Sequence, residues 1–77
     1  MLISLVDMKP GEIGTIADIR GGRGMMLRVQ HMGIRVGKRI MKAGSHFWRG
    51  PQTVIIDKFQ VAIGYGMASR IFVEVDR

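Results

Sequence analysis

The sequence predicts a mainly β protein, a small closed barrel of about five short strands with one short helix and one single helical turn. Three observations support this prediction. The 77 residues are enough for one domain, which we expect to span residues 1–77. Short β-branched and apolar runs recur along the chain, separated by turn residues. Most of the 11 glycines lie between these runs, where the tight corners of a small barrel need them, and closing the sheet removes exposed edges.

Five segments have the residue types expected of strands. They cover residues 15–19, 39–42, 53–56, 61–63 and 71–75. In the last segment, Ile71, Val73 and Val75 alternate onto one face. Residues 57–60 separate the third and fourth segments, so we expect a hairpin there, and residues 43–52 are expected to form a loop.

A short helix is predicted after the first of these strands, from Met25 to Met32. Met25, Val29 and Met32 have the i, i+4, i+7 spacing of one helical face, and proline is absent. Gly33 stands where such a helix must end, because glycine adopts the left-handed conformation at little cost. Ile34 would then meet Val29 in a Schellman cap, and both residues are apolar, as that cap requires.

Three further segments are expected to turn. Gly11 follows Pro10, a pair in which proline fixes φ and glycine permits a positive φ. Gly37 lies in a turn before the second predicted strand. Residues 67–70, just before the last strand, are expected to form the single helical turn.

The composition limits the function classes. The chain has no cysteine, which excludes disulfides and thiolate metal sites and fits a cytosolic protein. The opening run MLISLV is too short to span a membrane and lacks the basic start of a signal peptide, so we expect no membrane insertion. The net charge of +6 indicates an acidic partner, which could be nucleic acid, an anionic membrane surface or an acidic protein. The alternative is a basic surface that only keeps a small protein soluble.

Few residue patterns point to chemistry. The glycine-rich stretches GGRG and GYG complete neither phosphate-loop motif, and no serine stands near an evident base and acid. We therefore expect no enzyme and no cofactor. His31 and His46 lack co-ligands at metal-binding spacing, so we expect no metal site, although either could bind metal adventitiously. A single Arg-Gly-Gly copy leaves nucleic-acid binding as a disfavoured alternative.

Residues 45–51 are the segment best suited to contact a partner. Adjacent side chains in an extended chain point to opposite sides, so Phe47 and Trp48 can hardly both enter one small core. We expect Phe47 to face the core and Trp48 to contact the partner, with Arg49 and His46 beside it, because tryptophan and arginine are enriched at interface hot spots. The alternatives are that the exposed aromatic ring of this segment covers the end of the barrel, or that it mediates self-association into a homo-oligomer.

Residues 28–37, RVQHMGIRVG, resemble the signature of the FeoA family. In that signature an arginine, an apolar residue and a leucine or methionine precede a glycine, an apolar residue and a second glycine. Val36 departs from the pattern, because many members carry proline at this position. Further segments that resemble the family lie at residues 10–12, 50–54 and 61–73.

The resemblance implies an SH3-like barrel and the role of a small accessory protein in bacterial ferrous iron uptake. The implied partner is FeoB, a membrane transporter with a cytosolic G domain, which this protein would bind and regulate from the cytoplasm or at the inner membrane. Arg28 and Arg35 of the signature join the candidates for partner binding. One alternative is a stand-alone regulatory module related to the C-terminal domain of DtxR-type metal-dependent repressors. A basic nucleic-acid-binding barrel is the other.

Overall fold

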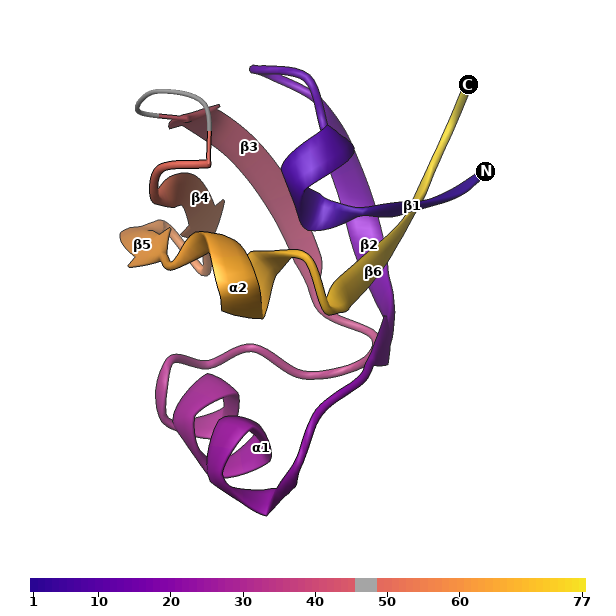
Figure 1. Cartoon of the computed structure of the whole chain (residues 1–77). Coiled ribbons are helices and arrows are strands. Elements are labelled where there is room, and N and C mark those ends of the chain that lie inside the picture. Colours follow the sequence, from indigo (N-terminus) through magenta and orange to yellow (C-terminus); the bar gives the residue numbers. More distant parts are fainter. Residues whose placement is uncertain (46–48) are drawn as a thin grey trace.

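The strands of this protein form one antiparallel sheet. The structure is a computed structural model and describes residues 1–45 and 49–77. Within those residues the sheet has six strands in the order β1-β6-β2-β3-β4-β5. They are β1 (Leu2–Ser4), β2 (Ile13–Ile19), β3 (Arg39–Ser45), β4 (Gln52–Ile56), β5 (Phe59–Ile63) and β6 (Ile71–Val75). The strands wrap into a small SH3-like barrel, which confirms the predicted mainly β class (Figure 1).

Strand β1 is the one that the sequence did not predict. It has three residues, too few to show an alternating pattern, and pairs with β6 so that Ile3 lies opposite Val73. β1 and β5 end the strand order, and within the described residues no pairing joins them. The sheet is therefore open between these two strands, where the sequence predicted a closed barrel.

Every strand contributes a buried apolar side chain to one core. The core residues on strands are Ile3, Ile16, Ile40, Val54, Ile56, Ile63, Ile71, Val73 and Val75, and those on other segments are Leu5, Met8, Val29, Ile34 and Ala68. The predicted alternation along the last strand is confirmed, because Glu74 between two of these buried valines is exposed. Burial of alternate strand residues is what fixes the register of the sheet.

The predicted hairpin is present, but its turn is shorter than expected. β4 and β5 are joined by Asp57 and Lys58 alone, and Ile56 pairs with Phe59. Both turn residues have positive φ, of 50° and 71°, as a type I′ turn requires. Phe59 and Gln60 therefore belong to β5, because two residues in the left-handed conformation are enough to reverse the direction of the chain.

Strand β3 also runs further than expected. The sequence predicts that this strand ends at residue 42. In the structure β3 continues to residue 45, through a shift in register between Lys42 and Gly44. A bulge of this kind bends the strand and lets the pairing with β4 resume. The connection between β3 and β4 is correspondingly shorter than the predicted loop over residues 43–52.

Helix α1 (Arg23–His31) ends in a Schellman motif. Gly33 has a φ of +81°, its amide donates to the Gln30 carbonyl at 3.0 Å, and the Ile34 amide donates to the Val29 carbonyl at 2.8 Å. These are the two hydrogen bonds that define the motif. The helix starts two residues before its predicted beginning at Met25.

A single turn of helix, α2 (Tyr65–Ala68), precedes β6. It starts two residues earlier than predicted, because Gly64 in extended conformation already serves as its N-cap. Two of the predicted turns contain glycine with positive φ. Gly11, at +84°, lies in a turn closed by a 2.9 Å bond from the Glu12 amide to the Lys9 carbonyl, and Gly37 has a φ of +96°.

Lys42 on β3 is buried, with only 1% of its surface exposed. Its Nζ donates to the carbonyl oxygens of Leu5 at 2.9 Å and Met8 at 3.2 Å, at the end of a short 3-10 helix, η1 (Leu5–Asp7). Burial lowers the pKa of Lys42, an effect that the charges of Asp7 and Glu12 partly oppose. The amine therefore ties β3 to the segment that follows β1.

Candidate functional site

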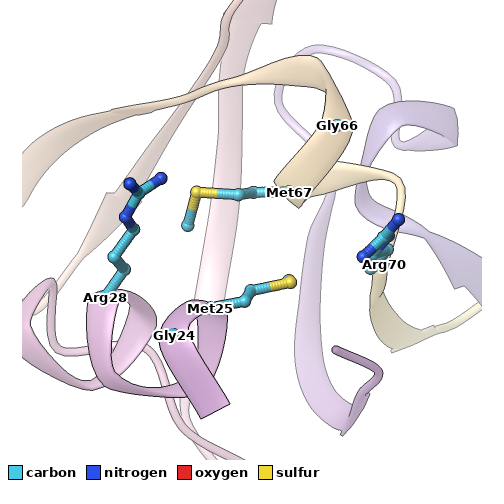
Figure 2. Close-up of a pocket in the computed structure, with 6 residues that line it drawn as sticks. All are labelled: Gly24, Met25, Arg28, Gly66, Met67 and Arg70. Carbon is cyan, nitrogen blue, oxygen red and sulfur yellow. The ribbon is translucent and has the colours of Figure 1, made fainter. Parts of the chain in front are cut away.

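An open groove of about 420 Å³ lies between α1 and α2. Its lining comes from α1 on one side and from α2 and the residues after it on the other, two segments that are far apart in the sequence (Figure 2). The lining residues are Gly24, Met25, Arg28, Gly66, Met67 and Arg70. We call this feature the α1–α2 groove. Figure 1 shows α1 outside the sheet, beneath α2.

One fully buried residue anchors each wall of the α1–α2 groove. Val29 on α1 and Ala68 on α2 both lie in the core and expose no surface. Met25 precedes Val29 by one helical turn, so it lies on the same face of α1, and Met67 is adjacent to Ala68. Both methionines are half-buried and pack against the core. The groove therefore has an apolar floor, formed by Met25 and Met67, that is continuous with the core.

Two of the residues that line the α1–α2 groove are glycines with open space around them. A Cβ atom built on Gly24 or on Gly66 would meet no other atom within 4 Å. Neither residue has a positive φ, so a larger side chain is compatible with the backbone at both positions. A larger side chain at either of these two lining positions therefore has open space to occupy.

Two exposed arginines flank the methionine floor. Arg28 and Arg70 make no ion pair with any other residue of the described ranges 1–45 and 49–77. In Figure 2 the Met67 side chain reaches toward the Arg28 side of the groove, whereas the Met25 thioether extends toward Arg70. Each cation therefore lies beside apolar surface, with its charge available to a ligand.

The charge distribution along the chain adds to the positive charge near the α1–α2 groove. Between Asp18 and Asp57 the sequence contains eight lysine and arginine residues and no aspartate or glutamate. This stretch includes α1 and therefore one wall of the α1–α2 groove. The surrounding potential favours an anion and disfavours a cation.

The side chains that line the α1–α2 groove in the described part of the chain suit binding. Its six lining residues include no carboxylate, hydroxyl, imidazole or thiol, which are the groups that act as general acids, bases or nucleophiles. Its methionines offer adaptable apolar contact, and its arginines offer charged hydrogen-bond donors. Elsewhere in the described residues, no group of three or more His, Cys, Asp or Glu side chains could hold a metal ion.

Of the predicted partner-binding residues that the structure describes, only Arg28 lines the α1–α2 groove. Arg35 is exposed on the connection between α1 and β3 and does not line the groove. Arg49 is exposed with a φ of 66°. His46 and Trp48, like Phe47, lie outside the described residues.

Met25, Met67 and Arg70 are lining residues that the sequence does not indicate as site residues. Met25 was assigned to the buried helix face, and residues 67–70 were assigned to a helical turn. No local pattern relates Arg28 to Arg70, because only the packing of α2 over α1 brings them to one groove. Among the described helices, none is long and apolar enough to cross a membrane.

In a comparison with protein families, the FeoA domain matches residues 3–75. Among solved structures, the chain is similar to the crystal structure of an iron uptake regulatory protein (FeoA), with 31% identity and a TM-score of 0.86. The alignment covers 96% of each of these two chains. No curated protein matches this chain.

Two further structures are similar. A FeoA-like protein from Clostridium acetobutylicum, solved by NMR, has 20% identity and a TM-score of 0.84, over 96% of this chain and 86% of that one. A manganese-dependent transcriptional repressor has 25% identity and a TM-score of 0.89, over 97% of this chain. Only 42% of the repressor is covered, so the present chain resembles one part of it.

Proposed function

Because this chain belongs to the FeoA family, we propose that it is an accessory protein of bacterial ferrous iron uptake that binds and regulates a FeoB-type transporter. The family match carries the proposal, since it extends over residues 3–75 and so includes both helices of the α1–α2 groove. Binding from the cytoplasmic side, with peripheral attachment to the inner membrane through the transporter, is part of the proposal.

The α1–α2 groove supports a binding role. It combines an apolar floor with two arginines that have no ion-pair partner in the described part of the chain. The net charge of +6 speeds the encounter with an acidic partner through electrostatic steering. Regulation through contact needs no catalytic group, and the groove lining has none.

The test uses the cytosolic domain of the FeoB-type transporter from the same organism. We expect calorimetry to show a saturable complex with the purified protein. Deleting the gene for this chain should lower the uptake of radioactive ferrous iron by whole cells, and a plasmid copy should restore it. The proposal is wrong if no complex forms and uptake is unchanged by the deletion.

A second candidate function follows from the similarity to the manganese-dependent repressor, which has a TM-score of 0.89. In this alternative the chain is a stand-alone regulatory module that contacts a metal-dependent repressor. Titrating the protein into a repressor–operator complex distinguishes the two functions. A change in operator affinity, with no binding to the transporter domain, would support the alternative.

A further inference from the structure

We propose that the α1–α2 groove binds an acidic segment of the partner protein, one that places an apolar side chain on the methionine floor and a carboxylate against Arg28 or Arg70. This inference rests on the proposed function and adds to it the place of contact and the chemistry of the partner segment. Three features of the α1–α2 groove lead to it: its apolar floor, its unpaired charges and its open glycine positions.

The methionine floor selects an apolar side chain. Met25 and Met67 are half-buried against the core, yet both still line the α1–α2 groove. An apolar side chain placed between them removes further apolar surface from water, which is favourable in proportion to the area covered. Methionine is flexible and polarisable, so this floor can adapt to side chains of different shape.

The two arginines select a carboxylate. A guanidinium group forms two parallel hydrogen bonds with a carboxylate, and such charge-assisted bonds are stronger than neutral ones. No carboxylate of the described residues pairs with Arg28 or Arg70, so a partner's carboxylate displaces no existing ion pair there. The stretch between Asp18 and Asp57, which includes Arg28, also contains no acidic residue that would repel it.

The same features disfavour other occupants. A ferrous or other divalent cation would lie between two guanidinium groups, and the lining that the structure describes offers it no carboxylate or imidazole. Single-stranded nucleic acid would need aromatic side chains on which bases stack, and none of the described residues that line the α1–α2 groove is aromatic. A lipid surface would contact the arginines, but such a contact does not account for the apolar floor between the two helices.

The experiment starts from a phage-displayed library of random peptides selected on the full-length protein. We expect enriched peptides with an Asp or Glu close to Leu, Ile, Phe or Met. The affinity of one enriched synthetic peptide is then measured by fluorescence anisotropy. At least one of the variants Arg28→Glu and Arg70→Glu should weaken it by about tenfold or more, because the carboxylate then faces a like charge at the position that it contacts.

Matched variants separate the α1–α2 groove from general charge effects. Arg39→Glu makes the same charge change at an exposed position on β3 that does not line the groove, and it should keep peptide affinity within about twofold. Gly24→Leu and Gly66→Leu fill the open space without altering charge, and both should abolish binding. Thermal melts of these variants should stay close to that of the wild type, because neither glycine has a positive φ.

Each other outcome counts against the inference. It is overturned if no peptides are enriched, if they lack acidic residues, or if groove variants bind them as the wild type does. It is also overturned if poly(U) RNA or phosphatidylserine vesicles bind tightly at physiological salt and lose that binding in Arg28→Glu. Measuring the transporter domain with the same variants separates the two proposals. If the domain binds the wild type and groove variants equally, the proposed function stands and the groove is not the contact site.

Discussion

Ile34 and Val29 meet across the end of helix α1. The Ile34 amide donates to the Val29 carbonyl at 2.8 Å, and both side chains are completely buried. The chain can make this contact because Gly33, with a φ of +81°, reverses its direction between them. The same contact holds α1 on the core, and α1 supplies one wall of the α1–α2 groove.

The first prediction is that Gly33→Ala destabilises the protein by about 1 kcal/mol, because a Cβ atom is strained in the left-handed conformation. No other atom lies within 4 Å of the added Cβ, so the backbone conformation is the only source of the loss. In a domain of this size the midpoint of a thermal melt should fall by about 4–8 °C.

Gly24→Ala is the matched control for this prediction. Gly24 lies within the same helix, its φ is not positive, and a Cβ there meets no atom. Because alanine favours the helix over glycine, the control should melt at the same temperature or higher. Equal melting of Gly33→Ala and the wild type would show that the cap does not depend on glycine.

Much of this fold can be predicted from local sequence. The end of α1 follows from an apolar periodicity that stops at Gly33, and β6 follows from the alternation of Ile71, Val73 and Val75. Each signal lies within a few residues. Strand β1 has no such signal, because its three residues become a strand only by pairing with β6 at the other end of the chain.

The features that the sequence did not reveal depend on long-range packing. Neither Asp57 nor Lys58 is a glycine, yet cross-strand pairing of β4 and β5 holds both residues at positive φ. Lys42 resembles an ordinary strand residue, and its burial depends on the carbonyl groups near η1. Of the α1–α2 groove, the sequence indicated Arg28 through the family signature, but not Arg70, which belongs to a distant segment.

The second prediction concerns Gly14, where β2 passes close to β6. A Cβ atom on Gly14 would lie 2.7 Å from the Glu74 carbonyl oxygen and 2.8 Å from Cγ1 of Val75, and it would also overlap Val73. Because one of these neighbours is backbone, the strands must separate to admit it. We expect Gly14→Ala to cost at least about 2 kcal/mol, more than Gly33→Ala, when unfolding is followed in urea. A smaller loss at Gly14 than at Gly33 would contradict this packing.

The third prediction concerns the pH dependence of stability from Lys42. Burial lowers the pKa of its amine in the folded protein, whereas the unfolded chain keeps the ordinary value of 10.5. Between the folded and the unfolded pKa the unfolded state binds more protons, so the free energy of unfolding contributed by Lys42 rises with pH. Urea unfolding from neutral pH to 10.5 should show this rise in the wild type relative to Lys42→Met.

Lys42→Met also tests the hydrogen bonds of the amine. The substitution keeps an unbranched side chain of similar length but leaves the carbonyl groups of Leu5 and Met8 without this donor. We expect a loss of about 1–3 kcal/mol at neutral pH, because the buried Met8 carbonyl loses its donor, whereas the Leu5 carbonyl still accepts from the Met8 amide at 3.2 Å. Identical pH profiles for the two proteins would mean that the pKa of Lys42 is not lowered by folding.

The last prediction concerns Glu12 and Arg77, which join the turn before β2 to the end of the chain. Arg77 Nε donates to Glu12 Oε2 and Arg77 Nη2 to Glu12 Oε1, both at 2.9 Å, and this pairing is the main reason that the pKa of Glu12 falls to about 2. A carboxyl group with a lowered pKa stabilises the fold above its unfolded pKa, and that contribution is lost as the pH falls from 4.5 toward 2. NMR titration of the Glu12 side chain should find its midpoint near 2. Arg77→Ala should move that midpoint up toward 4.5, because the largest cause of the lowered pKa is then removed.

Lys38→Ala is the control for this prediction. It removes a cation that pairs with Asp57 instead, so it should leave the Glu12 midpoint unchanged. A midpoint that stays low in Arg77→Ala would assign the shift to the Lys9 amide, which donates to Glu12 Oε1 at 3.0 Å.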